Sequence, residues 1–449
     1  MQLSQEIKSM AALAWPVVLS QLGLVTLGLT DILVVGQVSE QALAAVSLGH
    51  LFSFALLIVC FGILRGIDPF VSQAHGAGRG EELSGVWARS VCITLCGVVP
   101  VTLAHLCAQP ILAFFEQPAA ILPITGAYSC AVAAGVLPVL LMASMAGFLQ
   151  GMGRMHAPMV VVILSNVLNV GLNLALVLGV PALSIPAMEA LGSGVATTCV
   201  RWSGLVALAW LSRDVWRAYW PDSWREEIQW SKIKPMLRVG GPVGLQSGLE
   251  VWAFSALGLM MGVLGEKNLA AHAVAMQVIS VSFMIPSGIG VAASTRVGNL
   301  IGQGRSWRAA AWIAVGFAVG WMAISAGGML WGGRWIARAF TQDEQVIQTV
   351  LLLFPVAAGF QLFDGVQVSV FGVLRGAGDT VVPSVANIIG YWLVGLPLAY
   401  LMGIHLNQDP VMLWGGIAVS LAIISVLLLL RMRWLMARGV KALGDAHAA

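Results

Sequence analysis

Residues 11–36 read AALAWPVVLSQLGLVTLGLTDILVVG, an apolar stretch whose single ionisable side chain is Asp31. About 20 apolar residues in a helix cross the hydrocarbon core of a bilayer, which is about 30 Å thick. An ionised carboxylate in that core costs about 2.5–3.5 kcal/mol on insertion scales, so such an acid usually faces an aqueous cavity and binds something there. The stretch therefore predicts a membrane-spanning helix that carries a functional acid.

The composition of the whole chain agrees with this prediction. Of the 449 residues, 59% are hydrophobic and only 10% are charged, and the mean hydropathy is +0.89. A soluble domain carries about 25% charged residues. The sequence predicts twelve membrane spans, at residues 11–36, 43–67, 88–111, 124–148, 158–182, 190–212, 237–264, 270–295, 309–332, 347–374, 380–404 and 411–430.

The basic residues predict the orientation of these spans, because cytoplasmic loops of membrane proteins accumulate Lys and Arg. With the N-terminus inside, 18 of the 23 basic residues fall on cytoplasmic segments. Only Lys267, Arg334 and Arg338 fall outside, while Arg65 and Arg201 lie within spans. We therefore expect both termini in the cytoplasm.

The chain is built from two similar halves. A shift of 226 positions aligns residues 16–79 with 242–305 without a gap, giving 16 identities in 64 positions. A shift of 225 positions aligns the turn Gly151, Gly153, Pro158 with Gly376, Gly378, Pro383. We predict an N-terminal bundle over residues 1–212, a basic cytoplasmic linker over 213–236 and a C-terminal bundle with a short tail over 237–449.

These halves predict an all-α integral membrane protein with two six-helix bundles. An even number of spans gives both halves the same topology, so a pseudo-two-fold axis along the membrane normal should relate them. Parallel repeats of this kind usually enclose a cavity that opens alternately to the two sides of the membrane. The pattern is typical of a transporter.

Two further acids interrupt the apolar spans of the C-terminal half. Glu250 lies near the middle of the seventh span, one helical turn after Gln246. Asp364 lies on the tenth span between Gln361 and Gln367, and this spacing of three places the side chains on one helix face. Two carboxylates with nearby amides suit a cation such as Na⁺, or a proton that a competing cation displaces. The alternative is a pair of carboxyl groups that only form packing hydrogen bonds.

Asp31 belongs to the other half, where the fifth span offers Asn166, Asn169 and Asn173 on one helix face. These amides could assist Asp31 or only join helices through hydrogen bonds. The sequence leaves both interpretations open. Asp68 lies three residues after Arg65, and a local ion pair between them would explain both charges.

Several other site types have no pattern in this sequence. The cysteines lie in or at the ends of spans and have no C-x-x-C spacing, which indicates packing rather than redox chemistry or zinc binding. No P-loop, G-x-S-x-G or H-E-x-x-H motif occurs, and the histidines lack metal-ligand spacing. We expect no enzymatic activity, no cofactor and no nucleic-acid partner.

Residues along nearly the whole chain resemble the multidrug and toxic compound extrusion transporters, in particular their NorM-like branch. The resemblance rests on the duplicated twelve-span plan, on Pro16 to Gln21 followed by Asp31, on Phe283 to Pro286 followed by Arg296, and on the two Gly-x-Gly-x4-Pro turns. It implies an antiporter of the bacterial inner membrane that expels amphipathic, often cationic drugs, driven by Na⁺ or H⁺. It also implies that Asp31 titrates and that Glu250 and Asp364 bind the cation.

The apolar walls of a drug cavity would come from aromatic and methionine side chains, and the candidates are Phe254, Phe283, Met284, Phe360 and Phe363. We expect the chain to work as a monomer. One alternative is a flippase for lipids or lipid-linked oligosaccharides, although anionic substrates would call for more than the two intramembrane bases Arg65 and Arg201. Another alternative is an integral membrane enzyme that acts on lipids.

Overall fold

The computed structural model describes residues 2–181, 184–406 and 408–443. Helices dominate these residues, and an isolated bridge between Val180 and Ile185 is the only β pairing within them. The all-α class predicted from the sequence is confirmed. The end of the predicted span 158–182 falls on a residue outside the described ranges.

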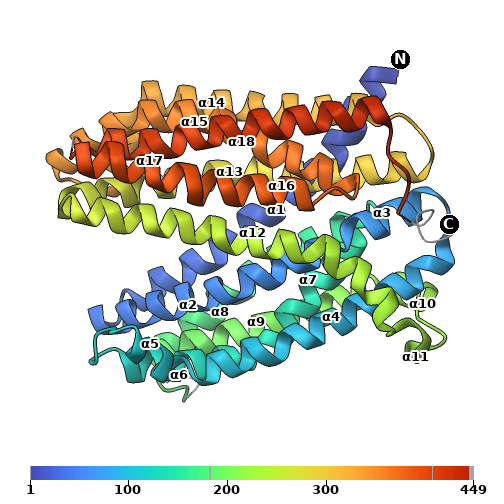
Figure 1. Ribbon diagram of the computed structural model, residues 1–449. Helices are drawn as coiled ribbons and strands as arrows, with labels where there is room; N and C mark the ends of the chain where they lie inside the picture. Colours follow the sequence, from blue (N-terminus) through green and yellow to red (C-terminus); the bar gives the residue numbers. More distant parts are fainter. Residues whose placement is uncertain (1, 182–183, 407, 444–449) are drawn as a thin grey trace. The chain divides into compact units, whose positions relative to one another are not determined.

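The helices follow one another in the order of the predicted spans (Figure 1). Those of the first half are α1 (Gln2–Val35), α2 (Glu40–Arg65), α3 (Asp68–Gly76), α4 (Gly80–Leu106), α5 (Ala108–Phe114), α6 (Leu122–Ala133), α7 (Val136–Gly151), α8 (His156–Val177) and α9 (Glu189–Leu211). The short helices α10 (Arg213–Ala218) and α11 (Trp224–Glu227) follow. The second half contains α12 (Trp230–Val263), α13 (Glu266–Gly302), α14 (Arg308–Phe340), α15 (Glu344–Gly376), α16 (Val381–Ile388), α17 (Leu396–Tyr400) and α18 (Pro410–Arg438).

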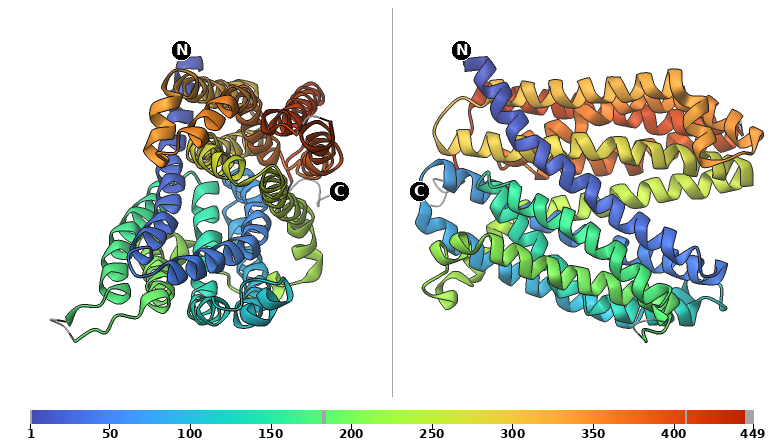
Figure 2. Two further views of the ribbon diagram at one scale, coloured as in Figure 1. Left: turned by 90° about the vertical axis from the view of Figure 1, so that its left-hand side faces the viewer. Right: turned by 180° about the vertical axis from the view of Figure 1, so that it is seen from behind.

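The packing divides the chain into two compact units. Unit 1 comprises Met1–Gln21, Asp68–Gly78 and Gly241–Ala449, and unit 2 comprises Leu22–Ile67 and Arg79–Gly240. In unit 1, α13, α14, α15 and α18 run alongside one another, and in unit 2, α8 runs alongside α9 (Figure 1, Figure 2). The start of α1 and the whole of α3 thus pack with the second half of the chain. The sequence-based domain boundaries near residues 212 and 237 stay a prediction.

The described residues contain ten helical segments that are long and apolar enough to cross a membrane. The pair α6 and α7 adds an eleventh candidate, so the predicted span 124–148 falls on two helices that meet at a bend of 49°. The predicted span 237–264 falls on α12, which is 34 residues long and carries Gln246 and Glu250 in its interior. Twelve spans are therefore consistent with the structure.

The repeated Gly-x-Gly turns have the same conformation in both halves. Gly153 and Gly378 have φ angles of 79° and 81°, in the left-handed region where a side chain is strained. In both turns the amide of the next residue donates to a carbonyl five residues earlier, at 2.8 and 2.9 Å. These bonds satisfy the last carbonyls of α7 and α15 and end both helices.

Within unit 1, α3 crosses the last turns of α13 at very short range. A Cβ atom on Gly76 would overlap the backbone of Asn299, and one on Gly302 would overlap the backbone of Gln73. Gly76 and Gly302 are equivalent positions of the two repeats, and so are Gln73 and Asn299. The repeat therefore supplies a glycine from α3 and a glycine from α13 to a contact that is too close for any larger residue.

A buried ion pair fixes α3 further. Arg375 of α15 lies 3.4 Å from Asp68, and both side chains are 4% exposed. The same guanidinium also contacts Ser294 of α13, at 3.3 Å. Three helices of unit 1 therefore meet at this ion pair. Its basic residue, Arg375, is far from Asp68 in the sequence.

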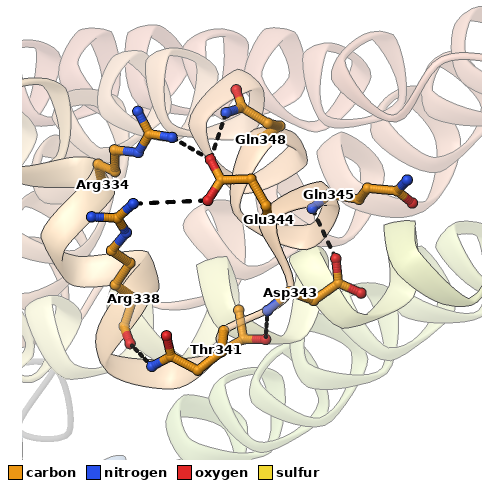
Figure 3. Close-up of polar contacts among 8 residues, drawn as sticks. Arg334, Arg338, Thr341, Asp343, Glu344, Gln345 and Gln348 are labelled. Carbon is orange, nitrogen blue, oxygen red and sulfur yellow. Dashed lines mark hydrogen bonds and ion pairs between the residues drawn. The ribbon is translucent and has the colours of Figure 1, made fainter.

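The turn between α14 and α15 is held by charged and capping groups (Figure 3). Arg334 and Arg338 of α14 both point to the carboxylate of Glu344. The carboxylate of Asp343 accepts a hydrogen bond of 2.8 Å from the amide of Gln345 and so caps the start of α15. These exposed groups hold the turn that joins α14 to α15.

Candidate functional site

The two acids of the second half lie close together within unit 1. Glu250 comes from α12 and is half-buried, while Asp364 comes from α15 and is 6% exposed. The two carboxylates interact electrostatically, and the interaction between like charges is repulsive. Two acids held together in a mostly apolar environment favour the binding of a positive charge between them.

A hydrogen-bond network joins these acids to side chains from three helical segments. Gln246 donates to Glu250 at 3.0 Å from one turn earlier on α12. Tyr391 donates to the other oxygen of Glu250 at 3.3 Å, and Gln367 of α15 donates to the Tyr391 hydroxyl at 3.2 Å. Gln246 and Gln367, which the sequence suggested as supporting groups, therefore both belong to the surroundings of Glu250.

Tyr391 was not among the candidates suggested by the sequence. It lies in a π-helical segment, Ile389–Gly395, that interrupts the predicted span 380–404, and a second one covers Leu401–Leu406. The wider helix turns Tyr391 inward, where it is 1% exposed, and π segments often occur at functional sites. Ser384, Asn387 and Tyr391 recur at spacings of three and four, and this polar stripe is the signal that could have identified them.

The same stripe brings two more polar groups to the site. Ser384 donates to the side-chain carbonyl of Gln246 at 3.5 Å. Asn387 is 1% exposed, and neither atom of its amide has a hydrogen-bond partner among the described residues. Gln361, which lies one turn before Asp364, is fully buried and unpartnered in the same way.

The groups around Glu250 and Asp364 are carboxylate, amide and phenol oxygens. Hard cations such as Na⁺ prefer oxygen ligands, and a proton requires only the carboxylates. The described residues contain no cluster of three or more His, Cys, Asp or Glu side chains that could hold a metal ion. The donor set therefore suits a monovalent cation or a proton better than a transition metal.

Asp31 belongs to unit 2, whereas the other two acids belong to unit 1, and it is 3% exposed. One of its oxygens accepts hydrogen bonds from Asn169 at 3.0 Å and from Asn173 at 2.8 Å. The other oxygen accepts from Thr197 of α9 at 3.0 Å. The sequence did not single out Thr197, because threonine is common in membrane helices and carries no distinct pattern.

Asn166, the third asparagine of α8, has a different role in the structure. Its side chain donates to the backbone carbonyl of Gly23 on α1 and to that of Val162 one turn earlier, both at 2.9 Å. These bonds join α8 to α1 near Asp31. The face of α8 therefore combines two amides that contact the acid with one that joins helices.

The five aromatic and methionine candidates lie in different surroundings. The ring of Phe254 is 5.7 Å from that of Tyr391, beside the acids. Phe360 is 3% exposed and packs on Trp414 in the apolar core of unit 1. Phe363 is 40% exposed at the surface, and Phe283 and Met284 are half-buried.

Comparisons with known proteins agree with the repeat and the fold. The MatE family model matches residues 16–175 and 242–401, so its two matches start 226 residues apart, as the two halves do. The multidrug resistance protein NorM of Burkholderia vietnamiensis is 32% identical over 440 residues, which cover 95% of this chain and 93% of the relative. The multidrug resistance protein PmpM of Pseudomonas aeruginosa is 30% identical over 449 residues, covering 96% and 92%.

A solved structure shows the same fold. The crystal structure of the eukaryotic MATE transporter AtDTX14 superposes with a TM-score of 0.86 at 21% sequence identity. The match covers 98% of this chain and 100% of that one. The fold is thus shared with a solved structure over almost the full length.

Proposed function

The chain belongs to the MatE family, and we propose that it exports amphipathic, often cationic compounds in exchange for Na⁺ or H⁺ by alternating access. Members of this family are transporters, and the relatives named above are multidrug resistance proteins. The chain is a multi-pass membrane protein. The distribution of its basic residues supports an inner-membrane location with both termini in the cytoplasm, and we propose a monomer as the working unit.

The observation that carries this proposal is the pairing of Glu250 and Asp364 within unit 1. Their mutual repulsion favours the binding of a cation, and Tyr391 and Gln367 supply further oxygens beside them. A cationic drug and the coupling cation would then compete for the same negative charge. Competition of this kind couples the exit of one cation to the entry of the other.

Asp31 would serve as a proton-binding group in unit 2. When it is ionised, all three of its neighbours donate to it. When it takes up a proton on the oxygen that faces Thr197, the threonine hydroxyl can turn and accept the bond, because a hydroxyl both donates and accepts. The amide bonds to the other oxygen are kept. The geometry therefore allows a proton to bind without breaking the network.

A flippase for anionic lipid-linked substrates fits the charges less well. Such a substrate needs basic groups that are free to bind phosphate. The buried guanidinium of Arg375 is already paired with Asp68, while the Nη1 atom of Arg201 is buried without a hydrogen-bond partner among the described residues. The acids at the centre of unit 1 would repel a pyrophosphate, whereas they attract a cationic compound.

The test is efflux of a cationic dye from liposomes that contain the purified protein, with Na⁺ or H⁺ gradients imposed one at a time. We expect one gradient or both to drive efflux. Asp364→Asn should reduce the rate by about tenfold or more, since it keeps the shape and removes a charge that coupling needs. Asp222→Asn, which removes an exposed acid, is the matched control. Dye efflux that ignores both gradients would refute the proposal.

A further inference from the structure

The inner face of α12 continues beyond the acids toward the other end of unit 1. Gln246, Glu250, Phe254 and Gly258 recur every four residues and so share one face. Glu250 and Phe254 both face Tyr391. A Cβ atom on Gly258 would lie 3.4 Å from the ring nitrogen Nε2 of His272 on α13, so the face ends against this histidine. Eight residues of helix separate Gly258 from Glu250, a distance of about 12 Å.

His272 forms a polar pair with Trp414 at this end. Their rings are 5.5 Å apart, and the two side chains are 6% and 2% exposed. The Nδ1 atom of His272 and the Nε1 atom of Trp414 have no hydrogen-bond partner among the described residues. The Trp414 ring is also 5.9 Å from Phe360, the neighbour of Gln361 on α15. The pair therefore lies next to the face of α15 that carries Asp364.

Unpartnered polar atoms continue from this pair to the acids and past them. Both amide atoms of Gln361 are fully buried without a partner, one turn before Asp364. Both amide atoms of Asn387, one turn before Tyr391, are also buried without a hydrogen-bond partner among the described residues. Three places in unit 1 thus contain buried polar atoms without a hydrogen-bond partner among the described residues. Such atoms are costly unless water or an ion satisfies them, so their recurrence near the two acids needs an explanation.

The positive-inside argument places the start of α13, and with it His272, toward the outer side of the membrane. An antiporter must bring its coupling ion from that side to the acids. An apolar groove in unit 1 lies elsewhere, since its lining comes from α1, α13 and α14 around Trp15, Gly316 and Trp321. None of the buried unpartnered atoms described above belongs to a residue of this groove.

We propose that His272, Trp414 and Gln361 line a narrow hydrated passage through which the coupling cation, a small monovalent ion, reaches Glu250 and Asp364 from the outer end of unit 1. The passage rests on the proposed antiport function and adds a separate entry for the ion. Gln361 offers a carbonyl oxygen to the ion one turn from Asp364, and His272 and Trp414 hold water at the entrance. Asn387 extends the hydrated region beyond the acids.

The passage predicts that a small cation reaches residue 361 from solution. Ag⁺ is a monovalent cation that reacts with thiols, so we would introduce Gln361→Cys or His272→Cys into a variant whose six native cysteines are replaced by alanine. Ag⁺ should block both introduced thiols within minutes, as measured by their failure to react with a maleimide after denaturation. Leu353→Cys is the matched control, because Leu353 is equally buried on α15 but lies in the apolar core.

The passage is supported if Ag⁺ reacts with the thiols at positions 361 and 272 but not with the thiol of Leu353→Cys. It would be overturned if Ag⁺ failed to react with any of the three thiols in variants that still bind a cationic dye. This measurement needs no transport. Failure of the passage would therefore leave gradient-driven efflux intact, whereas failure of the proposed function would abolish efflux without changing the labelling.

A second variant separates the passage from the drug site. His272→Phe keeps a flat ring and removes the polar atoms, so ion-driven dye efflux should slow by about fivefold while the dye dissociation constant stays within about twofold. His405→Phe, at an exposed histidine of the same unit, should leave both values unchanged. An unchanged efflux rate in His272→Phe would contradict a role for His272 at the entrance.

Discussion

Tyr391 links a carboxylate and an amide at the proposed cation site, because its hydroxyl contacts both Glu250 and Gln367. Removing a hydrogen-bond partner from a charged group costs about 1.5–3 kcal/mol. Without the Tyr391 hydroxyl, one hydrogen-bond donor fewer would stabilise the negative charge of Glu250 beside Asp364. At the proposed site, the affinity for the ion would therefore depend on single hydrogen-bonding side chains such as Tyr391.

We predict that Tyr391→Phe weakens the apparent affinity for the driving cation by about tenfold, since one hydroxyl ligand and donor is lost while the ring remains packed on Phe254. The measurement is the dependence of dye efflux on cation concentration in liposomes. Tyr400→Phe, at a 52% exposed tyrosine, is the control. A Tyr391→Phe variant with the wild-type cation dependence would show that the hydroxyl does not contribute.

The Thr197 hydroxyl donates a hydrogen bond to Asp31, so its removal should affect proton binding. Thr197→Val keeps the shape but removes the hydroxyl that can reverse its bond to Asp31. We expect the variant to lose most of the proton-driven component of efflux while still binding the dye. Thr198→Val is the control, because the Thr198 hydroxyl donates to the carbonyl of Ala131 and not to the acid. Equal proton-driven rates in the two variants would argue against a role for Thr197.

Single elements show which parts of the fold a sequence can predict. Apolar length and composition predicted the spans, and the left-handed glycines confirmed the repeated turns. The break between α6 and α7, where Gly135 comes shortly before Pro138, and the π-helical segment around Tyr391 were not predicted, because apolar length and composition do not locate a bend or a wide turn. Partners such as Thr197, Tyr391 and Arg375 come from distant spans, and no periodicity within one span reveals them.

The start of α15 provides a prediction about one element. Backbone hydrogen bonds from Gln345 and Val346 hold the pKa of Asp343 below its ordinary value. A depressed carboxyl pKa means that the cap is fully present above the ordinary value and is lost as the pH falls through the depressed one. Asp343→Ala should therefore speed hydrogen exchange at these two amides at neutral pH, as mass spectrometry can measure. Unchanged exchange would show that the cap is not needed.

The ion pair between Asp68 and Arg375 holds three helices together, since Arg375 of α15 contacts Asp68 of α3 and Ser294 of α13. Arg375→Met should destabilise the protein by about 3–5 kcal/mol, because it removes the guanidinium that is paired with a buried carboxylate. The double variant Asp68→Leu with Arg375→Met should recover most of this loss. Thermal unfolding in detergent is the measurement. A double variant no more stable than Arg375→Met would mean that the pair contributes more than charge compensation.

At the scale of the whole molecule, the duplicated sequence has produced two units with different chemistry. Unit 2 holds Asp31, which accepts three side-chain hydrogen bonds, and unit 1 holds Glu250 and Asp364, two acids that repel each other. The equivalent positions of the acids in the repeat are Leu257, Leu24 and Val139, so the duplication supplies the framework but not the charges. One unit thus suits proton binding and the other suits a shared cation.

The central claim is that a cation and a cationic drug compete at Glu250 and Asp364, and equilibrium binding of a cationic dye to purified protein tests it most directly. The dissociation constant would be measured as a function of Na⁺ concentration and of pH for the wild type, Glu250→Gln and Asp364→Asn. We predict that Na⁺ or protons weaken dye binding to the wild type, and that either substitution flattens this dependence. Identical dependences in all three proteins would contradict the account.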